Sequence, residues 1–152
     1  MNMMSPRRPG KALIRIAALA VLMAAGTQTA MAARLVAPDH LHNYWILLNR
    51  TVDVEVPDSG NNIDKPGCVA VSYLIGSDGV PRDVKVRASV PASDLGSAAI
   101  SAVSNFRYGP SLSNRGSDPV STYYVVPFNA PDDPAQQQHL MAACQLAGYP
   151  RG

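Results

Sequence analysis

Residues 68–89 read CVAVSYLIGSDGVPRDVKVRAS and hold the clearest secondary-structure pattern in the sequence. Apolar residues alternate with small or polar ones in both halves of this stretch, as in half-buried strands. Ser77, Asp78 and Gly79 lie between the halves, and glycine readily adopts the positive φ of a tight turn. Pro81 has no N–H, which places it at a strand start or at a bulge. The stretch therefore predicts a β-hairpin.

A helix and a third strand are predicted after the hairpin. Ser93 or Asp94 is a suitable N-cap, and apolar residues recur at helical spacing to about Asn105. Residues 120–128 read VSTYYVVPF and alternate again, which predicts a strand. A helical crossover favours parallel second and third strands with the first strand between them. The third strand is then expected at an edge of the sheet.

The flanking segments carry weaker patterns. Residues 39–49, DHLHNYWILLN, predict a short helix capped by Asp39, and TVDVEV at 51–56 predicts a strand. Residues 57–67 are rich in turn formers and are expected to form a loop, as are residues 106–119. A C-terminal helix begins at Asp133, with Pro134 in its first turn. The predicted fold class is α+β, a small three-stranded antiparallel or mixed sheet with helices packed on one face.

Residues 1–32 have the composition of a cleavable secretory signal. Basic residues without an acid come first, then the ten-residue apolar run IAALAVLMAA, and then Ala30-Met31-Ala32. We expect cleavage near Ala32/Ala33 and a periplasmic protein without a membrane span. The alternative is an uncleaved anchor, which needs about 20 apolar residues. The expected organisation is a signal at 1–32, a helix and linker at 33–66, and one domain with a C-terminal helix at 67–152.

Charge and cysteine content restrict the function of the part after residue 32. It holds nine Lys and Arg against eleven Asp and Glu, so the clustered basic face of a nucleic-acid-binding protein is not indicated. Cys68 and Cys144 are the only cysteines, and in an exported domain they predict one disulfide. Two separate buried thiols are the alternative. A metal site is disfavoured because neither cysteine has a second ligand at the usual spacing.

The sequence gives no indication of an enzyme. The motifs G-x-S-x-G, H-E-x-x-H and C-x-x-C and a glycine-rich phosphate loop do not occur. His40 and His42 would share a metal only on a strand, because residues two apart on a helix point away from each other. Asp132 and Asp133 stand at a helix start, where capping explains them. We predict no catalytic residue, no metal and no cofactor.

Three motifs in order resemble the C-terminal domain family of TonB, the periplasmic part of the energy transducer for outer-membrane transporters. They lie between about Gly67 and Phe128 and read GCVAVSYLIGSDGVPRDVKVRAS, SAAISAVSNFRYGPS and GSDPVSTYYVVPF. They resemble the family's strand–turn–strand, its amphipathic helix and its last strand. The resemblance implies the fold and a protein partner in the cell envelope, such as a TonB-dependent transporter. It does not imply energy transduction. Full transducers have an uncleaved membrane helix and a long Pro-rich spacer, whereas here about 35 residues that are not rich in proline separate the expected signal from the domain.

The predicted edge strand is the candidate binding site. An edge strand exposes unpaired N–H and C=O groups to which an extended peptide can add, and residues 121–126 contain no charge and no proline. The expected function is a periplasmic TonB-like module that binds a peptide of an envelope or outer-membrane transport protein there. One alternative is a structural envelope protein that self-associates as a homodimer through the same edge. Another is an edge covered by the last helix or by residues 51–56. The expected partner-binding residues are Ser121, Thr122, Tyr123, Tyr124 and Val125.

Overall fold

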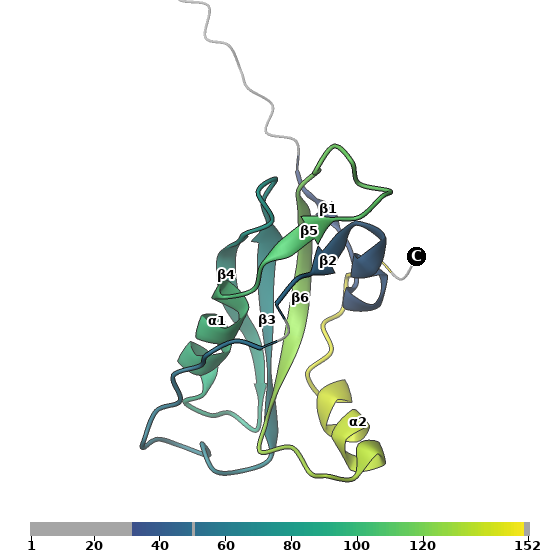
Figure 1. Ribbon diagram of the computed structural model, residues 1–152. Helices are drawn as coiled ribbons and strands as arrows, with labels where there is room; N and C mark the ends of the chain where they lie inside the picture. Colours follow the sequence, from purple (N-terminus) through teal and green to yellow (C-terminus); the bar gives the residue numbers. More distant parts are fainter. Residues whose placement is uncertain (1–31, 50, 151–152) are drawn as a thin grey trace, which may run out of the picture. The chain divides into compact units, whose positions relative to one another are not determined.

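The computed structural model describes residues 32–49 and 51–150 (Figure 1). The predicted signal, except for Ala32, lies outside the described residues, so its cleavage remains a prediction. The elements are β1 (Arg34–Leu35), the 3-10 helix η1 (Pro38–Asn43), β2 (Trp45–Leu47), β3 (Gly67–Ile75), β4 (Pro81–Val90), α1 (Gly96–Ser104), β5 (Tyr108–Pro110), β6 (Val120–Phe128) and α2 (Pro134–Ala142).

The predicted hairpin is confirmed as β3 and β4, which pair antiparallel. Gly79 has a φ of +75° in the connecting turn, and Pro81 is the first residue of β4. The register shifts twice along β4, and Asp83 has a φ of +52°, so this strand is bulged. The pairing between β3 and β4 is therefore irregular, whereas β3 pairs without a register shift with the strand on its other side, β6.

The main sheet has the order β1-β6-β3-β4. β6 pairs antiparallel with β3 over its whole length, from Val120 opposite Ile75 to Phe128 opposite Gly67. The predicted order of the three long strands is confirmed, and so are the bounds of β6. The sheet has four strands rather than three, because β1 pairs in parallel with the first two residues of β6. A two-residue strand is too short to show any alternation in the sequence.

One face of the sheet, the helix face, packs against α1 and the β2–β5 pair (Figure 1). Val69, Val71 and Tyr73 of β3 point to this face and contact Val103 and Trp45 within one apolar core. The buried part of α1 is mostly alanine, which lets the helix lie close to the sheet. α1 begins at Gly96, later than predicted, because the Asp94 carboxylate accepts a hydrogen bond from the N–H of Asn61 at 2.8 Å.

The opposite face, the disulfide face, packs against the C-terminal segment. Cys68 and Ala70 alternate with the helix-face residues of β3 and contact Cys144, Met141 and Leu146. The expectation that the helices share one face is therefore wrong. The position of Cys68 decides the matter, because its side chain points away from α1 and its disulfide holds the C-terminal segment there.

Two predictions for the N-terminal flank are also wrong. Residues 39–49 form η1 and then β2, which pairs antiparallel with β5 in the predicted loop 106–119. Trp45 is buried and its indole N–H donates to the backbone oxygen of Asp118 at 3.1 Å, whereas Ile46 is exposed. This in–out alternation suits a strand with a distant partner. Residues 51–56 form no strand.

Candidate functional site: the open part of the β6 edge

β6 is covered on its outer side only at its start. The N–H of Val36 donates to the backbone oxygen of Ser121 at 2.9 Å, and the chain then leaves the sheet to enter η1 at Pro38. Within the described chain, no strand pairs with β6 on this side beyond Ser121. The predicted edge is thus covered at Val120 and Ser121 and open from Tyr123 onward.

The hydrogen bond of Ser121 also shows which backbone groups face the open side. The N–H and C=O of one strand residue point to the same side, and successive residues alternate. Because the carbonyl of Ser121 points to β1, the N–H and C=O groups of Tyr123 and Val125 point outward. Pro127 presents only a carbonyl there. No other described residue donates to or accepts from these outward backbone groups.

A groove of about 470 Å³ follows this open stretch, and we call it the edge groove. Tyr123, Tyr124 and Val125 form its floor. The first residues of η1, Pro38 and Asp39, line it on one side. The C-terminal segment lines it on the other side with Met141, Gln145, Leu146 and Tyr149. The groove can hold one extended chain with backbone groups to pair and apolar side chains to contact.

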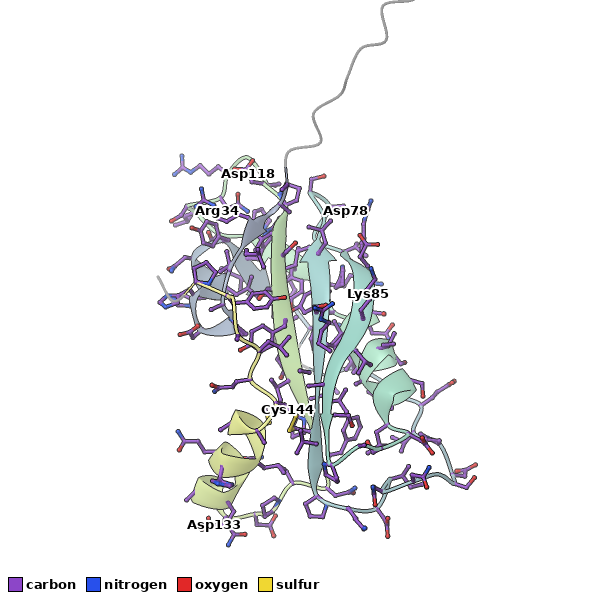
Figure 2. All side chains as sticks on the ribbon, turned by 180° about the vertical axis from the view of Figure 1, so that it is seen from behind. Arg34, Asp78, Lys85, Asp118, Asp133 and Cys144 are labelled. Carbon is purple, nitrogen blue, oxygen red and sulfur yellow. A yellow bond between two sulfur atoms is a disulfide. The ribbon has the colours of Figure 1, made fainter. Side chains whose placement is uncertain are left out.

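The C-terminal wall of the groove is attached to the sheet by a disulfide and by side-chain packing. The Cys68–Cys144 disulfide joins it to the start of β3, with both cysteines buried and their Cα atoms 6.1 Å apart. The rings of Tyr149 and Tyr123 lie 4.7 Å apart. Burial raises the pKa of Tyr149 above its usual range, although the charge of Arg87 opposes this. α2 itself buries no residue, and Met141 and Leu146 add partly buried apolar contacts with the sheet. Figure 2 shows Cys144 on this face, beside β3.

The other edge of the sheet, β4, is protected against strand addition. It carries Arg82, Asp83, Lys85 and Arg87, and its bulges interrupt the regular spacing of backbone groups. Charged side chains and bulges are the usual protections of an edge strand. The two edges differ in kind, and only β6 offers a regular, uncharged row of backbone groups.

Comparison with known families gives a match for the part of the chain that contains the groove floor. Residues 57–129 match the family model described as the Gram-negative bacterial TonB protein C-terminal. These residues are therefore similar to the TonB C-terminal family. The resemblance noted between Gly67 and Phe128 is thereby confirmed.

A comparison with solved structures found the solution NMR structure of the Pseudomonas aeruginosa TonB C-terminal domain. It shares 20% sequence identity, with a TM-score of 0.43, over 66% of this chain and 99% of that chain. A comparison with curated proteins gave no match.

The structure of this chain separates the five predicted binding residues into groups. Tyr123 and Val125 present outward backbone groups, and their side chains face the C-terminal segment. The backbone oxygen of Ser121 already accepts a hydrogen bond from the N–H of Val36, and Thr122 is buried on the helix face. Tyr124 lines the groove with a partly exposed ring that packs edge-on against Phe106.

The sequence predicts the walls of the groove only in part. It places Asp39, after Pro38, at the start of a helix, and it places the C-terminal helix on the same face as the other helix, with coverage of the edge by this helix as an alternative. The predicted disulfide is confirmed. It was the one signal in the sequence that linked the C-terminal segment to the sheet.

The described part of the chain also bears on metal ligation and on membrane spans. It holds no cluster of three or more His, Cys, Asp or Glu side chains suited to a metal ion. His40 and His42 lie on η1, and the imidazole of His40 is 3.4 Å from the carboxylate of Asp39. Among the described helices, none is long and apolar enough to cross a membrane.

Proposed function

We propose that this protein is a periplasmic binding module that adds one extended peptide of an envelope or outer-membrane transport protein to β6, between Tyr123 and Pro127. The unpaired N–H and C=O groups of Tyr123 and Val125 on the groove floor carry this proposal. Main-chain hydrogen bonds supply the affinity in binding of this kind. The contrast with the charged, bulged β4 edge supports it further. The module needs no catalytic group, cofactor or metal.

The periplasmic location is inferred from two independent features. Residues 1–32 have the order of a secretory signal, with basic, apolar and small residues in turn. The Cys68–Cys144 disulfide suits an oxidising compartment. The family of residues 57–129 agrees with this location.

The groove walls favour a peptide over self-association. The open edge lies between η1 and the C-terminal segment, so the edge of a second folded sheet meets these walls before it reaches the backbone of β6. A single extended chain enters between them. Alternate side chains of such a peptide face Met141, Leu146 and Tyr149, and we therefore expect apolar residues at every second position.

The test begins with recovery of the partner from an envelope extract and mapping of the bound segment. Val125→Pro removes one outward N–H and is expected to reduce affinity for that peptide at least tenfold. Val125→Thr keeps the N–H and the branched side chain, and serves as the matched control, with a change below about threefold. Circular dichroism checks that both variants are folded.

A second measurement leaves the protein unchanged. Peptides methylated at alternate backbone nitrogens lose their donors on one side only. One of the two methylation patterns is expected to abolish binding and the other to preserve it. Equal binding of both patterns, or full binding by folded Val125→Pro, contradicts strand addition.

A further inference from the structure

A second hollow of about 470 Å³ lies on the disulfide face, where the C-terminal segment does not cover the sheet. We call it the basic hollow. Its lining includes Ser72, Leu74, Lys85, Arg87, Ser121 and Tyr149. Figure 2 shows Lys85 on β4 at this open part of the sheet. The hollow is separate from the floor of the edge groove, and Tyr149 lines both.

The strand register explains why these polar groups meet. Lys85 lies directly opposite Ser72, and Ser121 lies opposite Leu74, so the four residues occupy adjacent positions on three strands. Arg87 is the extra residue of the bulge between Ala70 and Val71, which lets it line the same hollow as Lys85.

Both cations of the hollow lack an anionic partner within the described residues. Among the described residues, salt bridges join Arg82 to Asp78 and His40 to Asp39, and none involves Lys85 or Arg87. Asp83 also lines the hollow but makes no salt bridge with Lys85 or Arg87. The hollow thus offers one ammonium group, one guanidinium group and three side-chain hydroxyls. This set suits a ligand with more than one anionic oxygen.

We propose that the basic hollow binds an acidic peptide segment, whose carboxylates pair with Lys85 and Arg87 and whose apolar atoms contact Leu74. A membrane surface fits less well, because recognition of anionic lipids usually takes four to eight clustered cations. A nucleic acid fits less well because the part after residue 32 has more acids than bases. The proposal does not depend on strand addition to β6.

The experiment uses the exported protein and a fluorescent, end-capped octapeptide of glutamate, with the lysine octapeptide as the control probe. We expect binding of the glutamate probe only, with an affinity that falls as NaCl rises from 50 to 500 mM. K85Q/R87Q is expected to weaken binding by about 2- to 25-fold, since it removes two exposed ion pairs and each contributes a factor of roughly 1.5 to 5. K65Q/R115Q changes two exposed cations away from the hollow and is expected to stay within twofold.

Any of the following results overturns the proposal: no binding of the glutamate probe, equal losses in both double variants, displacement of the probe by millimolar inorganic phosphate, or binding to anionic phosphatidylglycerol vesicles that K85Q/R87Q abolishes. Folded Val125→Pro is expected to bind the glutamate probe normally. A loss there would assign the probe to the edge groove instead. Failure of strand addition and failure of the basic hollow are therefore distinguished.

Discussion

Gly79 is a single residue that joins the β3–β4 hairpin to β5. Its backbone oxygen accepts a hydrogen bond from the N–H of Tyr108 at 2.9 Å. A Cβ atom at this position would collide with the backbone oxygen of Tyr108, which cannot move without disturbing β5. Gly148 has a similar φ of +88°, but nothing lies within 4 Å of its would-be Cβ. Substitution of Gly148 therefore introduces backbone strain alone, whereas substitution of Gly79 adds a steric collision to that strain.

Gly79→Ala is expected to lower the free energy of unfolding by at least about 2–3 kcal/mol, from strain and collision together. Gly148→Ala experiences the strain alone and is expected to cost about 1 kcal/mol. Urea denaturation of both variants measures the difference. Equal losses would show that β5 moves freely and that the contact between Gly79 and Tyr108 is not rigid.

Tyr73 and Tyr108 form a buried hydroxyl pair with their oxygens 2.6 Å apart. Burial raises the pKa of Tyr108 to about 12, with the hydrogen bond to the Tyr73 hydroxyl opposing this, and burial also raises the pKa of Tyr73 well above its usual value. The folded protein therefore keeps these protons at pH values where the unfolded chain has lost them.

Stability is expected to be unaffected by this pair below about pH 10 and to fall as the pH rises from about 10 to 12. The loss for Tyr108 is about 2–3 kcal/mol, because a shift of one pKa unit corresponds to 1.36 kcal/mol. Urea denaturation at several pH values measures it. The Tyr73→Phe/Tyr108→Phe variant is the control and should show a flatter decline. An unchanged slope in this variant would place the alkaline sensitivity elsewhere.

The C-terminal segment is the element whose position depends most on one covalent bond. α2 begins with a side-chain cap, in which Asp133 accepts from the N–H of Gln136 at 2.8 Å, but none of its residues is buried. Met141, Leu146 and Tyr149 supply its remaining contacts with the sheet. The disulfide therefore positions the wall of the edge groove more than the helix does.

Cys68→Ala/Cys144→Ala is expected to release this wall while leaving the sheet folded. In the chain-entropy account, a closed loop with a sequence separation of 76 contributes about 4–5 kcal/mol to the free energy of unfolding. Hydrogen exchange is expected to rise in residues 134–149 and to stay low in β3. Asp133→Ala, which weakens only the helix cap, is the control. Unchanged protection of 134–149 in the cysteine-free variant would contradict this role.

At the scale of the whole molecule, the two edges of the sheet are treated differently. β4 carries charges and bulges, and β1 covers the first two residues of β6. Only the stretch that faces the edge groove is left open. Coverage by β1 therefore limits the length of the exposed edge, which reduces pairing with other chains.

Deletion of residues 33–36 from the processed protein is expected to expose Val120 and Ser121 and to increase self-association. Sedimentation velocity at rising concentration measures this. Alanine substitution of Arg34 and Leu35 keeps the strand backbone and is the matched control, which should remain monomeric. A deletion variant as monomeric as the control would show that β1 does not protect the edge.

The elements whose pattern is local could be predicted from the sequence. The strands in residues 68–89 and 120–128 and the glycine turn depend on neighbours a few positions apart and are confirmed, and the helix predicted from Ser93 or Asp94 to about Asn105 is confirmed with a later start. The two cysteines also predicted their own pairing. Tyr123 and Val125 could be named as edge residues because strand order follows from the helical crossover.

The remaining features could not be predicted, because the residues that determine them are distant in sequence. β1 and β2 have two and three residues, too few to show a period, and exist because β6 and β5 offer them backbone groups. Residues 39–49 have helical spacing, yet Trp45 gains more from burial against the sheet than from a helix. The groove walls follow from two long-range facts: Cys68 points away from α1, and the chain leaves the sheet after Val36.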